Sequence, residues 1–300
     1  MLYNNLSAYL KTKYGTRLSK ICIDGGFTCP NRDGKCGTGG CIFCGGRGAG
    51  EHIDARLSIR GQVEAALRTS SDSDRFIAYF QSFTNTYAPT DVLRRRYDEA
   101  LIDPRILVLA VGTRPDCIDC ATAELLCEYR ERLDVWVELG LQTASDDIAR
   151  LINRGYTTDV FLGAAELLNS YQIPFVVHTI IGLPGESEWE LDKTVDLVNS
   201  VRPFGVKLHS MYVMRDTALA DMYYRGEYTP LAREEYVALA TRAIARLNPE
   251  TVLHRITGDC PRDLLVAPDW NTDKNGTVAA IQARLRDTGM RQGSLYSSHL

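Results

Sequence analysis

Residues 19–46 decide the fold of this chain, and their sequence is SKICIDGGFTCPNRDGKCGTGGCIFCGG. The first six residues, 19–24, form a short apolar run that predicts a β-strand. A loop rich in Gly and Cys follows at once, over residues 25–50. Within it, Cys41 and Cys44 are separated by two residues, a spacing that lets both sulfurs reach one metal centre from a tight turn. The order of strand and then cysteine loop predicts a metal site at the carboxyl end of the first strand.

Strand-like and helix-like segments alternate from this point to about residue 247. Short apolar runs rich in β-branched residues predict buried strands at 19–24, 75–81, 105–111, 134–142, 174–181 and 205–212. Helices are predicted at 5–14, 56–69, 90–102, 119–132, 145–153, 158–171 and 187–201. Six β-then-α steps predict a parallel α/β sheet, either open and doubly wound or closed into part of a barrel. Residues 1–247 are expected to form this core. Residues 248–300, with a strand at 251–256 and a helix near 275–288, are expected to pack on it as a C-terminal extension.

The composition is that of a folded globular protein. The chain has 300 residues, of which 45% are hydrophobic and 24% charged, and this excludes a wholly disordered or fibrous protein. The formal net charge is −4, so no bulk positive charge indicates nucleic-acid binding. No apolar run is long enough to span a membrane, and the N-terminal residues lack the apolar core of a signal peptide. We therefore expect a cytoplasmic protein with no membrane partner.

The cysteines predict a metal centre rather than disulfides, because no secretory signal precedes them. Beside Cys41 and Cys44, the third ligand is either Cys29 or Cys36. Three thiolates leave one metal position open, as in an iron–sulfur cluster that binds a substrate, whereas four would indicate structural zinc. From the residues alone both kinds of site stay open. The remaining cysteines are Cys22, Cys117, Cys120, Cys127 and Cys260, of which 117 and 120 form a second pair with the same spacing.

Eight short motifs resemble those of the radical S-adenosylmethionine (radical SAM) superfamily and, within it, those of the YhcC/YtqA-type group, whose core is similar to that of the elongator catalytic subunit. In chain order they are GGFTCPNRDG, GGCIFC, YFQSFTNTYAP, VGTRPDC, WVELGLQT, INRG, IIGLPGE and HRITGD. They extend from about residue 22 to residue 261, which is most of the chain.

The resemblance implies a partial (β/α)6 TIM-type barrel with the metal site at its C-terminal mouth. Because the YhcC/YtqA-type group has a long first gap in its cysteine motif, the resemblance assigns Cys29, Cys41 and Cys44 as ligands of a [4Fe–4S] cluster and leaves Cys36 as an ordinary thiol. In such enzymes the cluster binds S-adenosylmethionine (SAM) and reductively cleaves it to a 5′-deoxyadenosyl radical, which abstracts a hydrogen atom from the substrate. An electron donor such as flavodoxin or ferredoxin is implied as a partner.

The resemblance also implies which residues hold SAM. Gln142, at the end of a predicted strand, and Arg154 match the Gln and Arg that bind the SAM carboxylate and ribose in the coproporphyrinogen-oxidase-like branch. On spacing alone, a charge at a helix C-terminus is the simpler interpretation of Arg154. His178 matches a polar position that contacts SAM, with a core histidine as the alternative. The residues expected beside the adenine are Phe43, Gly182 and Pro184.

Further polar residues end predicted strands and, in a barrel, face the same cavity. Gln81 and Thr113 are candidates for cofactor binding, and Arg114 is a candidate for catalysis. Glu138 lies four residues before Gln142, on the same face of its strand, and is a second catalytic candidate. A buried structural Glu is the alternative for Glu138.

The C-terminal extension supplies the last candidates. HRITGDCP, residues 254–261, carries side chains that donate, accept or titrate. We expect the extension to close the open side of the barrel and to bring His254, Arg255 or Asp259 to the substrate, with His254 and Asp259 as catalytic candidates. An extension that only packs on the barrel is the alternative.

The sequence leaves the substrate open among three hypotheses. The first is a radical SAM enzyme that acts on the wobble uridine of tRNA, as the resemblance to the elongator and YtqA-type proteins implies. The second is a radical SAM enzyme that acts on a small metabolite. The third is a non-catalytic iron–sulfur or zinc protein. Basic stretches at residues 11–20, 94–96 and 284–291 favour RNA binding, whereas the net charge opposes it.

Overall fold

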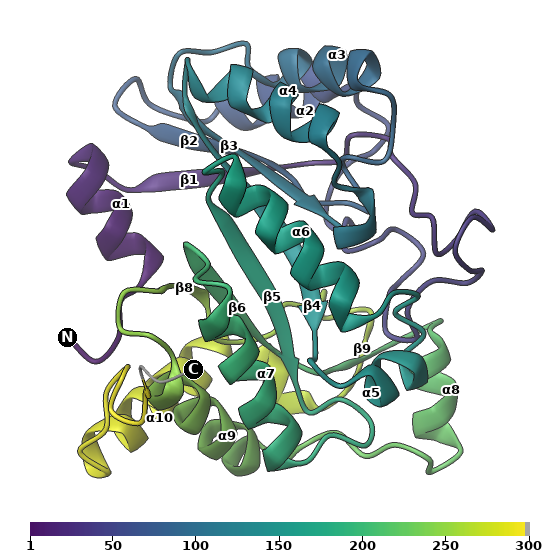
Figure 1. The fold of residues 1–300 in the computed structure, drawn as a ribbon, viewed down its shortest axis with the longest axis vertical. Coiled ribbons are helices and arrows are strands. Elements are labelled where there is room, and N and C mark those ends of the chain that lie inside the picture. Colours follow the sequence, from purple (N-terminus) through teal and green to yellow (C-terminus); the bar gives the residue numbers. More distant parts are fainter. Residues whose placement is uncertain (298–300) are drawn as a thin grey trace.

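The computed structural model describes residues 1–297 and shows one curved sheet of seven parallel strands (Figure 1). The strands lie in the order β1, β2, β3, β4, β5, β6, β8. Their bounds are β1 Leu18–Ile23, β2 Arg75–Phe80, β3 Ile106–Thr113, β4 Asp134–Gln142, β5 Phe175–Ile181, β6 Gly205–Ser210 and β8 Val252–Arg255. The predicted partial barrel is confirmed, with one strand more than the six β-then-α steps.

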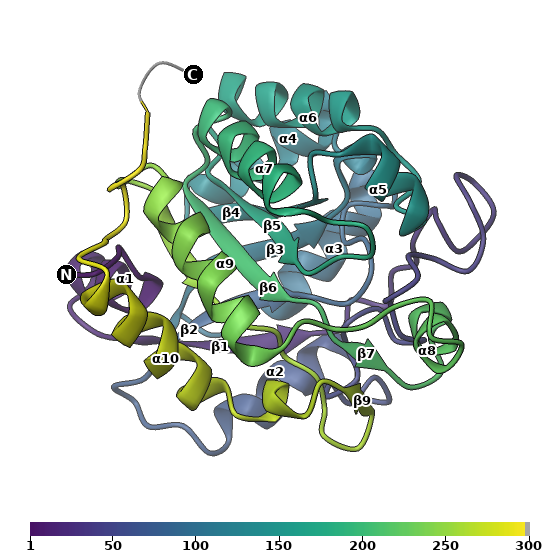
Figure 2. The same cartoon turned by 90° about the horizontal axis from the view of Figure 1, so that it is seen from below.

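Most of the helices cover the outer face of this sheet (Figure 2). Their bounds are α1 Leu6–Tyr14, α2 Ile59–Leu67, α3 Thr90–Ala100, α4 Cys120–Arg130, α5 Asp146–Leu151, α6 Thr158–Ser170, α7 Glu188–Ser200, α8 Ala218–Tyr224, α9 Arg233–Arg246 and α10 Lys274–Asp287. Polar side chains cap the amino ends of several of these helices. Asp119, the N-cap residue of α4, accepts from Thr122 N at 2.8 Å. None of the helices in residues 1–297 is long and apolar enough to cross a membrane.

Each strand faces two environments, and β4 illustrates the division. Its outward side chains are apolar and join the core between sheet and helices: Val135, Val137, Leu139 and Leu141. Its inward side chains, Trp136, Glu138 and Gln142, change from aromatic to charged to polar toward the carboxyl end of the strand. Because side chains alternate along a strand, the core lies outside the curved sheet and the polar residues collect inside it.

Helix α1 fills the inside of the half-barrel at the amino ends of the strands. Leu10 of α1 is buried in one apolar cluster with Trp136, and Phe204 packs against the edge of that cluster. The ring of Phe204 lies 5.0 Å from that of Tyr9 and 5.7 Å from that of Trp136. This packing closes the lower end of the interior, so the interior is open only toward the carboxyl ends of the strands.

The C-terminal part of the chain contributes to the sheet as well as packing on it. Strand β8 pairs in parallel with β6, and α10 packs against α9. A separate two-stranded ladder joins β7, Val213–Met214, to β9, Leu265–Ala267. The division of the chain at residue 247 stays a prediction, but the part after it supplies the last strand of the main sheet.

Candidate active site

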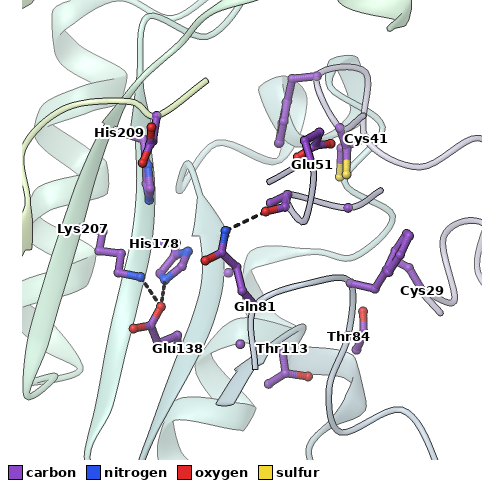
Figure 3. Close-up of a pocket in the computed structure, with 18 of the residues that line it drawn as sticks. Cys29, Cys41, Glu51, Gln81, Thr84, Thr113, Glu138, His178, Lys207 and His209 are labelled. Carbon is purple, nitrogen blue, oxygen red and sulfur yellow. Dashed lines mark hydrogen bonds and ion pairs between the residues drawn. The ribbon is translucent and has the colours of Figure 1, made fainter. Parts of the chain in front are cut away.

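A cavity of about 430 Å³ opens at the carboxyl ends of the strands, between the cysteine loop and the inward-facing strand residues (Figure 3). The predicted site residues that line it are Cys29, Cys41, Phe43, Cys44, Gln81, Thr113, Arg114, Glu138, Gln142, His178 and Asp259. The four predicted residues that do not line it are Arg154, Gly182, Pro184 and His254. Residues from all seven strands of the main sheet and from the cysteine loop therefore meet in one place, as the barrel rule requires.

Hydrogen bonds from the side chains of Arg32 and Asn31 hold the cysteine loop at the cavity. Arg32 donates to the carbonyl oxygens of Cys44 and Gly45 at 2.8 and 2.7 Å. The amide of Asn31 donates to the carbonyl oxygen of Asn153 at 2.6 Å and lies 3.9 Å from the sulfur of Cys41. These contacts fix the loop against the turn after α5, so its cysteines face inward.

The three cysteines that line the mouth of the cavity fit the predicted cluster in type and placement. Burial, and then the nearby Cys44, raises the pKa of Cys41 to about 12, and burial also raises the pKa of Cys44 although Arg32 opposes this. Such thiols favour their neutral form until a metal cation takes their protons' place. Among residues 1–297, no three His, Cys, Asp or Glu side chains converge on one point as a single metal ion would need. A cluster differs, because each cysteine binds a separate iron.

The other cysteines lie in different surroundings. The sulfur of Cys36 is exposed, is not part of the cavity wall, and lies 3.6 Å from a carboxylate oxygen of Asp116. Cys117 lies 4.0 Å from the same carboxylate. Cys22 and Cys260 line the cavity, and neither was a predicted site residue. Of the two candidates for the third ligand, Cys29 is the one that faces the cavity.

Gln142 ends β4 in a backbone conformation that ordinary side chains seldom adopt, with a φ of 64°. The hydroxyl of Tyr156 donates to its Oε1 at 3.0 Å, which leaves the amide nitrogen free to donate elsewhere. A Cβ atom on Gly140 would lie 2.8 Å from that nitrogen, so a larger residue there would displace the Gln142 amide. Strained backbone of this kind is typical of functional sites, and it turns the Gln142 amide toward the cavity.

The two predicted arginines have different surroundings, and one expectation is corrected. Arg154 is 0% exposed. It donates to the carbonyl oxygens of Leu141 and Thr143, each at 2.7 Å, and of Tyr156 at 3.0 Å. Its guanidinium is occupied by the backbone and does not reach the cavity, so we no longer assign it to the SAM carboxylate. Arg114 lines the cavity and is paired with Asp116 at 2.8 Å.

The turn after β5 is also differently placed from the expectation. Gly182 has a φ of 91°, its N–H donates to Glu186 at 2.7 Å, and its carbonyl oxygen accepts from Tyr228 at 2.7 Å. A Cβ atom on Gly182 would lie 2.8 Å from Leu231. The glycine is required by this packing rather than by a ligand in the cavity. Phe43, by contrast, lines the cavity as expected.

Of the two catalytic candidates in the C-terminal extension, one lies at the cavity and the other does not. Asp259 lines the cavity, where it pairs with Arg255 at 3.3 Å and with Lys274. His254, the third of the four residues of β8, packs into the interior, where its ring is 5.5 Å from that of Trp136 and 5.3 Å from that of Phe204. His254 is therefore part of the interior packing, and its assignment as a catalytic residue is corrected.

At the inner end of the cavity, the predicted residue Glu138 meets Lys20 and Lys207, which sequence reasoning missed. The carboxylate of Glu138 contacts Lys207 Nζ, and it lies 2.9 Å from His178 Nε2 and 3.9 Å from Lys20 Nζ. Burial opposes the charged form of Glu138, but Lys207 and Lys20 hold its pKa well below its usual value. The signal was present in the sequence, because Lys207 and His209 occupy alternate positions of a predicted buried strand.

Comparison with known families places this architecture. Residues 32–198 match the model of the radical SAM superfamily, and residues 203–287 match that of the radical SAM C-terminal domain. The uncharacterized protein YtqA of Bacillus subtilis is 34% identical over 298 residues, which are 98% of this chain and 92% of that protein. Protein YhcC of Escherichia coli is 34% identical over 295 residues, 98% of this chain and 96% of that protein.

Two further relatives are longer proteins that this chain matches in part. A tRNA uridine(34) acetyltransferase of Methanocaldococcus jannaschii is 30% identical over 167 residues, 54% of this chain and 30% of that protein. The solved structure of Elp3 from Methanocaldococcus infernus matches with a TM-score of 0.69 at 19% identity, over 92% of this chain and 64% of that one. The chain shares its fold with that structure and, by the family models and the two bacterial relatives, belongs to the radical SAM superfamily of SAM and iron–sulfur enzymes, as its motifs predicted.

Proposed function

We propose that this protein is a radical SAM enzyme that modifies the wobble uridine of tRNA, with a [4Fe–4S] cluster on Cys29, Cys41 and Cys44. The observation that carries the chemistry is the single cavity that those three cysteines share with polar strand ends. When bound there, the cluster and SAM would supply reductive cleavage of SAM and removal of a hydrogen atom from the substrate. The protein itself binds SAM and the substrate and excludes water from the cavity.

The residues proposed to hold SAM lie beside the cysteines. Gln142 has a free amide donor, and Thr113 lies on the neighbouring strand with its hydroxyl 2.6 Å from that of Thr86. Phe43 offers an apolar face for the adenine. Arg114 remains a candidate for binding or catalysis, although its pairing with Asp116 neutralises it in part. Gln81 donates to the carbonyl oxygen of Ala49 at 2.6 Å and is proposed to support the loop at the mouth.

The tRNA substrate is proposed from the likeness to a tRNA uridine(34) acetyltransferase, which covers over half of this chain. The basic stretches give it limited support. Residues 11–20 cover the end of α1 and the start of β1, which is the closed end of the barrel. Arg94 and Arg95, on α3, are paired with Glu128 and Asp91. RNA would therefore have to contact the rim of the cavity rather than the first two of these stretches.

The direct test compares tRNA nucleosides from cells with and without the gene by mass spectrometry. A change confined to the wobble uridine, restored by the wild-type gene but not by a Cys41→Ala gene, is the expected result. Unchanged tRNA nucleosides would overturn the tRNA proposal. Release of 5′-deoxyadenosine from SAM by the reduced protein, with flavodoxin or ferredoxin as the proposed electron donor, tests the chemistry separately.

A small metabolite is the alternative substrate, and the enclosed, charged inner end of the cavity is the observation that favours it. It predicts SAM cleavage that is stimulated by a cell extract freed of RNA, with tRNA nucleosides unchanged. A non-catalytic metal protein predicts no SAM cleavage at all.

A further inference from the structure

The inner end of the cavity holds a buried charged group that the proposed cluster and SAM do not use. The carboxylate of Glu138, on β4, contacts Lys207 from β6 and His178 from β5 (Figure 3). The Glu138 side chain is 0% exposed and that of Lys207 is 4% exposed. All three residues line the cavity. Strand register explains the meeting, since Lys207 lies opposite His178 and Glu138 is one strand further along.

This arrangement is costly for a purely structural pair. Removing two charges from water costs several kcal/mol for each ion, and an apolar pair of similar volume is often as stable. One carboxylate oxygen of Glu138 also lacks a partner. This oxygen, Oε1, is buried and has no hydrogen-bond partner among residues 1–297. Lys20 Nζ, the nearest cation to that oxygen, lies 3.9 Å away. The oxygen can accept a hydrogen bond from an N–H or O–H group of a molecule in the cavity.

Lys207 is the member of the group that can change its charge near neutral pH. Burial lowers the pKa of Lys207 to about 7, Glu138 opposes the shift, and Lys20 and Arg255 add to it. The titratable groups that face it from the surrounding strands are Lys20 and Cys22 on β1, Tyr79 on β2, Glu138 on β4, His178 on β5, His209 on β6, and His254 and Arg255 on β8. Burial lowers the pKa of His178 to about 4, so that ring is neutral and its Nε2 donates to Glu138.

We propose that Lys207 is the proton-transfer group of this cavity, which accepts a proton from an N–H or O–H group of the substrate next to the carbon that loses its hydrogen atom. The inference rests on the proposed function for that hydrogen abstraction. Glu138 and His178 are positioning residues: Glu138 holds the amine and stabilises the ammonium that forms, and His178 orients Glu138.

The step balances without a further reactant. The hydrogen atom leaves the substrate carbon with one electron, as in any reaction of this class. Loss of that atom makes the neighbouring N–H or O–H bond more acidic. That bond then breaks, its electron pair stays on the substrate nitrogen or oxygen, and the proton forms a bond to the neutral Nζ of Lys207. A group with a pKa near the working pH is the most effective one for such a transfer.

The first test observes the amine directly. The chain has seven lysines, so the ε-carbon signals of the ¹³C-lysine holoenzyme, with its cluster oxidised, can be assigned by variants. The Lys207 signal is expected to titrate at about 7 and to be missing in Lys207→Met. Glu138→Gln should lower this midpoint because it removes a supporting negative charge. Lys20→Met, the matched variant, should raise it because it removes a positive one. A midpoint in the ordinary lysine range would overturn the inference.

The second test separates proton transfer from a structural role. Lys207→Arg keeps a cation beside Glu138 but does not release its proton at neutral pH. The substrate for this test is tRNA from cells that lack the gene. Lys207→Arg is still expected to cleave SAM, but it should form product about a hundredfold more slowly than wild type. Product formation by wild type should rise with pH through the Lys207 midpoint. Wild-type turnover and an unchanged pH profile in Lys207→Arg would assign Lys207 to structure alone.

The two proposals fail in different ways. If the wild-type enzyme leaves the tRNA unchanged while Lys207 titrates near 7, the proposal of a tRNA substrate is wrong and the proposal for Lys207 is not contradicted. If the tRNA is modified while Lys207 titrates as an ordinary lysine, the substrate stands and the proton-transfer role is wrong.

Discussion

Arg114 donates a hydrogen bond to the carbonyl oxygen of Arg154 at 2.9 Å, and both guanidinium groups lie over the ring of Tyr156, at 4.7 and 4.6 Å from its centre. The two arginines thus contact the same tyrosine ring, whose hydroxyl contacts Gln142. Arg154 is fully buried behind the cavity wall, whereas Arg114 is 8% exposed and faces the cavity. The pair joins the cavity to the backbone that supports it. Replacing Arg154 is therefore expected to have a different effect from replacing Arg114.

Arg154→Met should destabilise the fold. It removes the guanidinium donors of the carbonyl oxygens of Leu141 and Thr143 and the cation that lies 3.2 Å from Asp146. The free energy of unfolding should fall by about 2–4 kcal/mol, because a buried carbonyl oxygen that loses its donor costs about 1–3 kcal/mol. Urea denaturation measures it, with Arg150→Met, a surface arginine just before it in the chain, as the control. A normal unfolding free energy with weakened SAM binding would instead return Arg154 to cofactor binding.

The cluster ligands give a second prediction. Cys29→Ala, Cys41→Ala and Cys44→Ala should each abolish the cluster, because the remaining two thiolates cannot hold it. Iron analysis after anaerobic reconstitution should give about four irons per chain for wild type and far fewer for these variants. Cys36→Ala is the matched control and should keep the cluster, since that sulfur is exposed outside the cavity. Loss of iron in Cys36→Ala together with its retention in Cys29→Ala would reverse the assignment.

Glu186 predicts a pH dependence of stability. Burial raises its pKa from 4.5 to about 8, against the backbone N–H groups of Gly182 and Leu183. The unfolded chain therefore releases this proton at a lower pH than the folded one does. Stability must fall as the pH rises from about 4.5 through about 8, and it is fully retained below that window.

Glu186→Gln tests this, because glutamine keeps the shape of the protonated acid and does not ionise. The variant should lose the fall in unfolding free energy between these pH values and should be more stable than wild type at alkaline pH. The measurement is urea denaturation at several pH values, with the exposed Glu188→Gln as control. Parallel pH profiles for wild type and Glu186→Gln would show that Glu186 ionises normally in the folded protein.

The two candidates of the C-terminal extension should separate stability from turnover. His254→Ala leaves a space between Trp136 and Phe204 and should lower the unfolding free energy by roughly 2–4 kcal/mol. Asp259→Asn keeps the volume, and because Asp259 lines the cavity we expect retained cluster, retained SAM binding and reduced substrate turnover. Thermal unfolding and the nucleoside assay measure the two effects. Wild-type turnover in Asp259→Asn would leave this loop a structural cover.

The sequence by itself determined the repeating architecture and the metal loop. Short apolar strands between helices specify a parallel sheet, because only that arrangement buries both faces of each strand. Two cysteines in a tight turn after the first strand specify a metal site at the mouth of that sheet. The inward position of Glu138 also followed, since it shares the face of Gln142 through the two-residue period of a strand.

Only the tertiary structure decided what each polar side chain meets. Arg154 is satisfied by carbonyl oxygens of residues 11 to 13 positions away, and no local spacing reveals that a guanidinium is already occupied. The place of His254 depends on the register of β8, which sets it beside Gly205 at the closed end while Arg255 lies opposite Lys207. Lys207 acquires its low pKa from burial and from the cations Lys20 and Arg255 on two other strands, against the opposing charge of Glu138, and such a sum exists only after the sheet has curled around them.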